Sequence, residues 1–249
     1  MVKLIPERLK ENALVNVLFE IRFSSENNTF SNIMPGILFT ELSLKNSFRT
    51  PHFEMPEIIR QQNADFKYLP LVGFIWGDYN ILLGDNVLLL SVNSRYPGWE
   101  TFKKHICILM NIVKKHDLIS VVERFSLKYV DIIEYPSAEN IGEQLNMCIS
   151  LGDENYLDPY LHLRSEKHEG DVVIIIQLAG NARAEGPAIK TREGFMIDID
   201  CIINKRNLTF ENVIQNFESE LDSLHHKNKT VFFNFLTDKA LANLGAVYE

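Results

Sequence analysis

The amino-acid sequence predicts an α+β fold, in which mainly antiparallel sheet packs on long helices. The prediction follows from segments that alternate apolar and polar residues, a turn sequence between two apolar runs, and segments with apolar residues at helical spacing. Short turns between consecutive strands favour antiparallel pairing over a parallel α/β arrangement. The predicted elements form two successive ββαβ-like halves, residues 1–136 and 137–249, packed tightly enough to allow a single domain.

The first half contains two alternating strands, a hairpin and a helix. Residues 13–24 (ALVNVLFEIRFS) alternate in polarity, with Phe19 on the inward face and Glu20 on the wetter one. The turn sequence at residues 84–86 lies between two apolar runs and predicts a β-hairpin. A helix is predicted over residues 98–116, and a second alternating strand follows at residues 119–136.

The second half repeats this order. The sequence predicts a short helix at residues 141–150, a hairpin turning at residues 169–171, a strand at 194–204 and a helix at 210–225. Thr209 and Thr237 are candidate helix caps. Residues 179–194 are rich in small and basic residues and predict a loop that acts as a lid or contact arm, with disorder as the alternative.

Composition excludes several classes of protein. The chain has 46% hydrophobic and 23% charged residues, as in ordinary globular proteins, and a formal net charge of -8. Nucleic-acid binding is disfavoured, because phosphates require clustered lysine and arginine. There is no signal-peptide pattern, and no apolar run reaches the roughly 20 residues that span a bilayer. We therefore expect a cytoplasmic protein. The three widely spaced cysteines predict packed, reduced thiols.

One candidate site is a carboxylate pair. Asp198 and Asp200 lie at positions i and i+2 of a predicted strand, so both side chains should lie on one face. Such a pair could hold a divalent metal ion or share a proton. The alternative is that both carboxylates point to solvent from a sheet whose other face is core.

The second candidate site consists of basic residues. If the predicted strands are neighbours, their cations would form an anion-binding patch, because the planar guanidinium group suits phosphates and carboxylates. The patch would comprise Arg22, Arg124, Lys128, Arg183, Lys190 and Arg192. The alternative is pairing with nearby carboxylates, which is the commoner outcome on a sheet face. The candidate partners are Glu20, Glu123 and Asp131.

Three passages resemble a known family: LVNVLFEIRF, ERFSLKYVDII and the C-terminal stretch that begins IDIDCII. The chain is similar to an uncharacterised, sporadically distributed prokaryotic family. That family has an N-terminal E-I-R-F strand, a central R-x-x-L-[RK]-Y strand and a C-terminal L-H…F helix and strand. The chain departs from the family's usual residues at Ala13 and Leu14, where the family tends to have Pro and Ile, at Lys128, where Arg is usual, and at Asp131, where the family has Asn. The resemblance implies no established activity, only the patchy distribution of mobile or defence-linked genes.

The sequence favours a non-enzymatic interaction or sensing module. It lacks a GxGxxG loop after a strand, a P-loop and an HExxH helix, so no cofactor is predicted. A protein partner is expected, and a homo-oligomer is compatible with the sequence. The alternative is a small-ligand or nucleotide-binding protein that acts as a metal-dependent hydrolase through Asp198 and Asp200.

Overall fold

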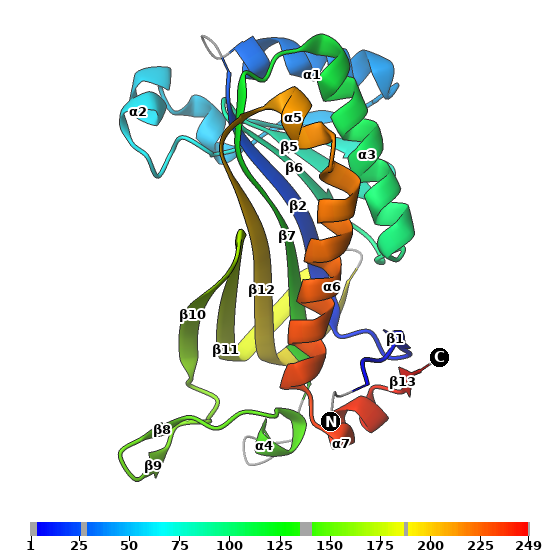
Figure 1. The fold of residues 1–249 in the computed structure, drawn as a ribbon, viewed down its shortest axis with the longest axis vertical. Coiled ribbons are helices and arrows are strands. Elements are labelled where there is room, and N and C mark those ends of the chain that lie inside the picture. Colours follow the sequence, from blue (N-terminus) through cyan, green and yellow to red (C-terminus); the bar gives the residue numbers. More distant parts are fainter. Residues whose placement is uncertain (1–3, 26–28, 135–140, 187–188, 249) are drawn as a thin grey trace. The chain divides into compact units, whose positions relative to one another are not determined.

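The structure confirms the α+β fold predicted from the sequence. It is a computed structural model that describes residues 4–25, 29–134, 141–186 and 189–248 (Figure 1). The strands pair mainly antiparallel, and several helices accompany them. None of the helices in these ranges is long and apolar enough to cross a membrane.

The chain forms two compact units, each assembled from separate stretches. Unit 1 comprises Met1–Val17, Lys128–Cys201 and Leu224–Glu249, and unit 2 comprises Leu18–Leu127 and Ile202–Ser223. The units differ from the predicted halves 1–136 and 137–249, because four long elements contribute residues to both. These elements are β2 (Leu14–Ser24), β7 (Val121–Ile133), β12 (Ile189–Thr209) and α6 (Phe217–Phe235).

In unit 2 the parts of β7 and β2 are followed by β6, β5, β4 and β3 in the sheet. The bounds of the last four are β6 (Val87–Val92), β5 (Tyr79–Leu83), β4 (Val72–Trp76) and β3 (Ser47–Arg49). The predicted hairpin at residues 84–86 is confirmed, since Leu83 pairs with Leu88. Its first turn residue must be glycine, because a Cβ at Gly84 would lie 2.1 Å from the carbonyl oxygen of Leu69.

Among the helices of unit 2, α3 (Trp99–His116) follows the apolar stripe predicted for residues 98–116. Besides α3 and its part of α6, unit 2 contains α1 (Thr29–Glu41), the 3-10 helix η2 (Pro51–Glu54), α2 (Glu57–Gln62) and α5 (Phe210–Ile214). Helix α3 buries the residues at helical spacing, among them Phe102, Ile106 and Leu109. Thr209 caps α5, since its hydroxyl accepts a hydrogen bond from the backbone N–H of Asn212 at 3.4 Å.

Aromatic side chains fill the core of unit 2. Phe19 and Phe125 are fully buried, and Phe217 on α6 lies against both, with ring centroids 5.8 and 5.1 Å away. Both contacts are edge-to-face, the geometry that the aromatic quadrupole favours. The alternation predicted for residues 13–24 therefore places one face of β2 in the core, as expected.

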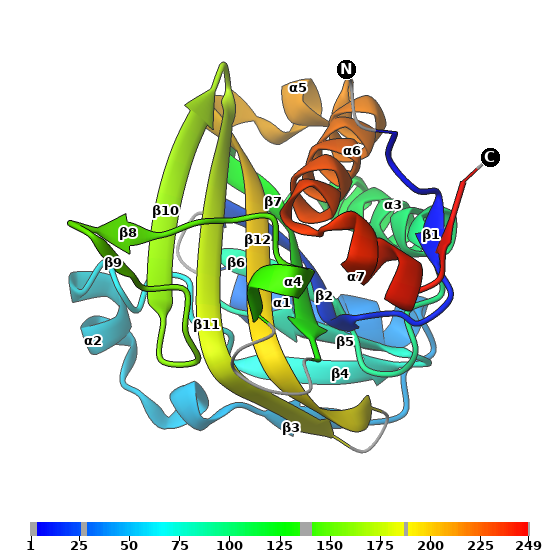
Figure 2. The same ribbon diagram turned by 90° about the horizontal axis from the view of Figure 1, so that it is seen from below.

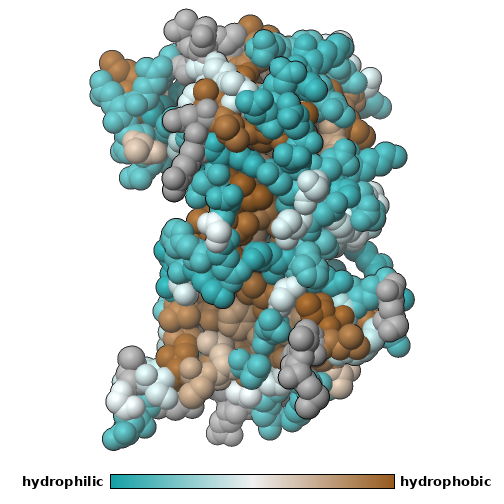
Figure 3. Space-filling model, viewed as in Figure 1, coloured by the Kyte–Doolittle hydropathy of each residue, from teal (hydrophilic) through white to brown (hydrophobic). Residues whose placement is uncertain are grey.

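Unit 1 contains the second predicted hairpin. Strands β10 (His162–Glu169) and β11 (Val172–Gly186) pair antiparallel around Gly170, whose positive φ of 62° suits glycine. Figure 2 shows the two strands side by side. The sheet continues from β11 to β12, β7 and β2. Figure 3 shows an apolar area over the lower part of the β10–β11 hairpin.

Short elements complete unit 1. They are β1 (Arg8–Leu9), α4 (Ile141–Gln144), β8 (Ser150–Leu151), β9 (Glu154–Asn155), α7 (Asp238–Asn243) and β13 (Ala246–Val247). Strand β1 pairs with β13, so the two ends of the described chain meet. The predicted cap at Thr237 is confirmed: its hydroxyl accepts from the N–H of Ala240 at 3.1 Å.

Three predicted elements differ from the structure. The loop predicted at residues 179–194 is wrong, because β11 runs to Gly186 and β12 starts at Ile189. The helix predicted at residues 210–225 is two helices, α5 and α6, and α6 continues to Phe235. The helix predicted at residues 141–150 ends at Gln144. In each case tertiary packing decides the extent of an element whose local signal is weak.

The cysteines differ in exposure, which gives a first prediction. Cys148 is exposed, so the expected packing is wrong for that thiol, whereas Cys201 is buried. Burial raises the pKa of Cys107 to about 11 and that of Cys201 to about 12. We expect one thiol, Cys148, to react rapidly with a chromogenic thiol reagent in the native protein, and all three to react in denaturant. Rapid reaction of either remaining thiol in the folded Cys148→Ser variant would contradict the prediction.

Candidate functional site

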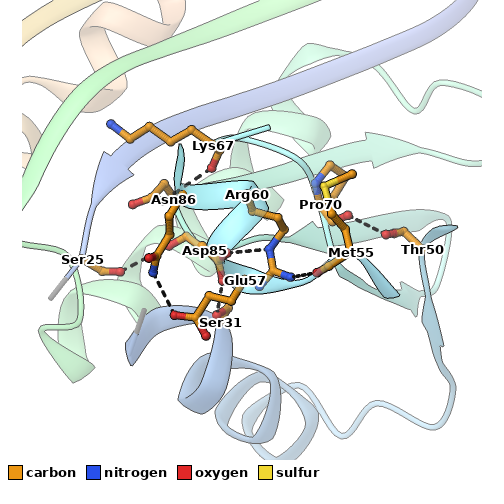
Figure 4. Close-up of polar contacts among 11 residues, drawn as sticks. Ser25, Ser31, Thr50, Met55, Glu57, Arg60, Lys67, Pro70, Asp85 and Asn86 are labelled. Carbon is orange, nitrogen blue, oxygen red and sulfur yellow. Dashed lines mark hydrogen bonds and ion pairs between the residues drawn. The ribbon is translucent and has the colours of Figure 1, made fainter. Parts of the chain in front are cut away.

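A buried ion pair lies at the centre of the polar cluster in Figure 4. Asp85, in the turn between β5 and β6, accepts hydrogen bonds from the Ser31 hydroxyl at 2.6 Å and from Arg60 Nε at 2.9 Å. The side chains of Arg60 and Asp85 are only 11% and 7% exposed. Arg60 also donates to the carbonyl of Met55. We call Ser31, Arg60 and Asp85 the Asp85 cluster; it ties α1 and α2 to the hairpin turn.

A small pocket opens beside the Asp85 cluster. It has a volume of about 190 Å³, and all of its lining residues belong to unit 2. Phe53, Leu71, Val72 and Leu83 supply apolar walls, and Glu57 adds a second carboxylate. With two carboxylates and one guanidinium, the lining carries a formal charge of -1, which favours a cationic ligand.

Arg22 and Arg124, two of the predicted ligand residues, meet at Glu20 in unit 2. Glu20 Oε1 lies 2.7 Å from Arg22 Nε and 2.6 Å from Arg124 Nη2. This is the carboxylate pairing that the sequence analysis kept as the alternative. Both guanidinium groups are thus engaged within the chain, and a role in ligand binding stays a prediction.

A second carboxylate, Glu123 on β7, lies near this group and accepts a hydrogen bond from the Ser24 hydroxyl of β2 at 2.9 Å. Burial alone would raise the pKa of Glu123, but hydrogen bonds from Lys67, Tyr68 and Ser24 outweigh it and lower that pKa. The guanidinium of Arg22 lies 4.5 Å from the centroid of the Tyr68 ring. Glu123 therefore fastens the segment between α2 and β4 to the sheet, while the Asp85 cluster holds α2 itself.

The predicted metal residues lie in unit 1, where Lys128 neutralises one of them. Lys128 Nζ is 2.7 Å from Asp198 Oδ2, and the Asp198 side chain is only 8% exposed. Gln177 donates to the same oxygen at 3.4 Å. The ammonium group reduces the attraction of Asp198 for a second cation. Among the described residues no group of three or more histidines, cysteines or carboxylates is placed to hold a metal ion. The metal site at Asp198 and Asp200 stays a prediction.

The remaining predicted basic residues lie on the β11–β12 hairpin of unit 1. Arg183 is exposed and pairs with Glu185 at 3.0 Å and with Glu193 at 3.1 Å. The charge of Arg192 acts on the buried Asp131, whose pKa it lowers against the larger effect of burial. The side chain of Lys190 lies outside the part of the chain that the structure describes.

Comparison with known proteins does not assign the chain to a family. No family model matches the chain. No curated protein matches it either. The resemblance to the sporadically distributed prokaryotic family therefore stays a prediction.

Sequence reasoning missed the Asp85 cluster. Asp85 belongs to the turn sequence that predicted the hairpin. Aspartate is common in turns, so the turn alone accounted for this residue and no functional role was assigned to it. Arg60 lies in a segment with two prolines and no clear periodicity, and Ser31 lies 54 residues from Asp85 along the chain. Such a contact leaves no local signal.

Asp131 gives a pH-dependent prediction. Burial raises its pKa from 3.8 to about 8, so between these values the folded chain holds a proton that the unfolded chain has lost. Stability due to this group therefore falls as the pH rises through that window. We expect Asp131→Asn, which cannot ionise, to raise the Tm at about pH 8 relative to the unsubstituted protein and to flatten the pH dependence.

Thermal unfolding across this range checks the effect, with the exposed Asp153→Asn as the matched control. A Tm that depends on pH equally in the Asp131→Asn variant and the unsubstituted protein would contradict the assignment.

Proposed function

We propose that the protein is a non-enzymatic interaction module, acting in the cytoplasm, and that a partner protein binds the outward face of α1. The observation that carries the proposal is the composition of this helix. It has no charged residue before Glu41, its last position. A surface helix normally carries charged residues on its outer face, and a helix that is apolar all round is normally buried.

Only one face of α1 is buried within the chain. Phe30, Met34 and Leu38 recur at intervals of four residues and are fully buried. On the outer side Ile33 and Phe39 are each 45% exposed. Exposed apolar side chains of this kind, gathered on one element, are typical of a protein-binding surface.

Gly36 supports close approach of a partner at the middle of α1. It is exposed, and a Cβ there would have no atom within 4 Å. Ile33, Gly36 and Thr40 recur at spacings of three and four residues, so they line one stripe of the helix. An apolar helix from the partner fits this stripe best, since helix recognition depends on anchors at these spacings.

The family resemblance suggests the setting of this interaction. If the chain belongs to the sporadically distributed prokaryotic family, the partner would be a component of a mobile or defence-linked system and encoded by a neighbouring gene. This placement is an analogy, and the physical part of the proposal depends on α1 alone.

Removing the apolar side chains of α1 should abolish partner capture. Both replaced side chains are partly packed, and the centroid of the Phe39 ring lies 6.5 Å from that of Phe74. Ile33→Ser with Phe39→Ser should therefore lower the free energy of unfolding by about 1–3 kcal/mol and leave the chain folded, which a thermal melt checks. Ile75→Ser is the matched control, because Ile75 on β4 is also 45% exposed. The measurement is co-purification of the neighbouring gene product with each variant from the native host.

We expect the unsubstituted protein and the Ile75→Ser variant to retain the partner, and the α1 variant to lose it. Equal retention by the α1 variant would exclude α1 as the interface, and absence of any partner together with absence of self-association would exclude the interaction function.

A second candidate function is binding of a small cationic ligand in the pocket beside the Asp85 cluster. A volume of about 190 Å³, apolar walls and a negatively charged lining suit a short amine with an apolar body. Because Ser31 and Asn32 of α1 line the same pocket, occupancy would act directly on the first turn of α1. This arrangement would make the module a sensor.

Ligand binding is tested by thermal shift with a panel of short aliphatic and aromatic amines and the matching carboxylic acids. We expect amines alone to raise the Tm, and Glu57→Gln to weaken the effect several-fold by removing one negative charge from the lining. Glu54→Gln, which changes a nearby exposed carboxylate outside the lining, should leave it unchanged. Equal responses to amines and acids would contradict the assignment.

A further inference from the structure

Strand β10 is the last strand of its sheet and lies at an open edge. It pairs with β11 along all eight of its residues, and the sheet order places no strand on its other side within the described chain. Residues 162–168 are all exposed. Natural proteins blunt such edges with proline, a bulge, a very short strand or charged side chains, since free N–H and C=O groups can pair with another chain. Strand β10 has no proline and is regularly paired throughout. Its protection is its charged side chains, so a strand that pairs with it must complement those charges.

The charges along β10 are self-complementary. Arg164 and Glu166 lie at equal distances on either side of Ser165 and point to the same face of the strand. A two-fold axis perpendicular to the sheet and midway between the Ser165 residues of two copies would place Arg164 of each copy opposite Glu166 of the other. Opposite charges directly across an antiparallel pair stabilise it.

We propose that two copies of the chain associate through antiparallel pairing of their β10 strands, with Ser165 opposite Ser165 of the second copy. The sheet of unit 1 then continues into the second copy, and the interface is isologous, as in most homodimers. Backbone hydrogen bonds supply the association, and the two reciprocal Arg164–Glu166 pairs fix the register.

The neighbouring registers are disfavoured by like charges. Symmetric pairing about Glu166 would place Glu166 opposite itself, and pairing about Arg164 would place Arg164 opposite itself. Both arrangements set equal charges directly across the interface, which is destabilising. Only the register centred on Ser165 makes two attractive pairs and overlaps most of the strand.

Exposed apolar residues at the beginning of β10 add to the same edge. Leu163 is 37% exposed and Tyr160, just before the strand, is 82% exposed. In the Ser165-centred register Leu163 lies opposite Lys167 of the second copy, whose aliphatic stem can cover it. The pairing would therefore shield apolar surface as well as satisfy backbone groups.

Charge reversal tests the register by sedimentation at increasing protein concentration. Arg164→Glu alone places glutamates across the interface, and Glu166→Arg alone places arginines there. Each should weaken dimerisation about tenfold or more. The double variant Arg164→Glu with Glu166→Arg should restore dimerisation, as should an equimolar mixture of the two single variants.

Recovery in the mixture separates this interface from a structural role within one chain. Arg164 and Glu166 also contact each other in the same strand at 3.2 Å. Loss of that contact affects both single variants alike, and mixing cannot repair it. A monomeric unsubstituted protein at millimolar concentration, unchanged dimerisation in the single variants, or a monomeric mixture would each overturn the proposal.

A disulfide trap provides a second measurement. In a Cys148→Ser background, Ser165→Cys places two thiols across the two-fold axis, within the Cα separation that a disulfide tolerates. Oxidation should give a covalent dimer rapidly. Lys167→Cys lies on the same exposed strand, but in this register residue 167 of one copy faces residue 163 of the other. The two introduced thiols are then four residues apart along the strands and should cross-link much more slowly. Equal rates for the two variants would overturn the proposed register.

Discussion

Burial of one face of β2 against aromatic side chains is the constraint on which unit 2 depends. Phe19 and Phe125 are side chains that the alternating pattern turns inward, and both lie against Phe217 of α6. A shift of β2 by one residue would expose Phe19 and bury Glu20, whose charge has its partners on the opposite face. The hydrophobic pattern therefore sets the position of the ion pairs as well as the core.

Local patterns in the sequence account for much of the fold and for little of the candidate site. The strand at residues 13–24, the hairpin at 84–86 and the cap at Thr237 depend on neighbours in sequence, so their chemistry can be read directly. The β11–β12 hairpin was missed because residues 179–194 include many small residues with low β-propensity. Such residues form strands when cross-strand neighbours pair with them. Extended pairing of that kind is a tertiary effect.

The charged residues illustrate a second limit. Sequence reasoning identified Arg22, Arg124 and Lys128 as exceptional cations on strands, and the structure gives each of them a carboxylate partner within 2.7 Å. Because a half-buried cation requires compensation, a cation on a sheet face is first an indication of a nearby anion. The Asp85 cluster follows the same rule, but its members come from three elements, and only the folded chain brings them together.

The two proposed interfaces differ in the charge that they present. At a formal charge of -8, two copies repel each other, so self-association requires a surface where this repulsion is small or reversed, and β10 provides one by placing cations and anions about Ser165. Helix α1 carries no charge before Glu41, so binding there depends on apolar contact and little on the charge of the partner. An uncharged surface accepts any apolar helix, whereas an alternating one selects a register. Helix α1 is thus suited to a separate partner, and β10 to a second copy of the chain itself.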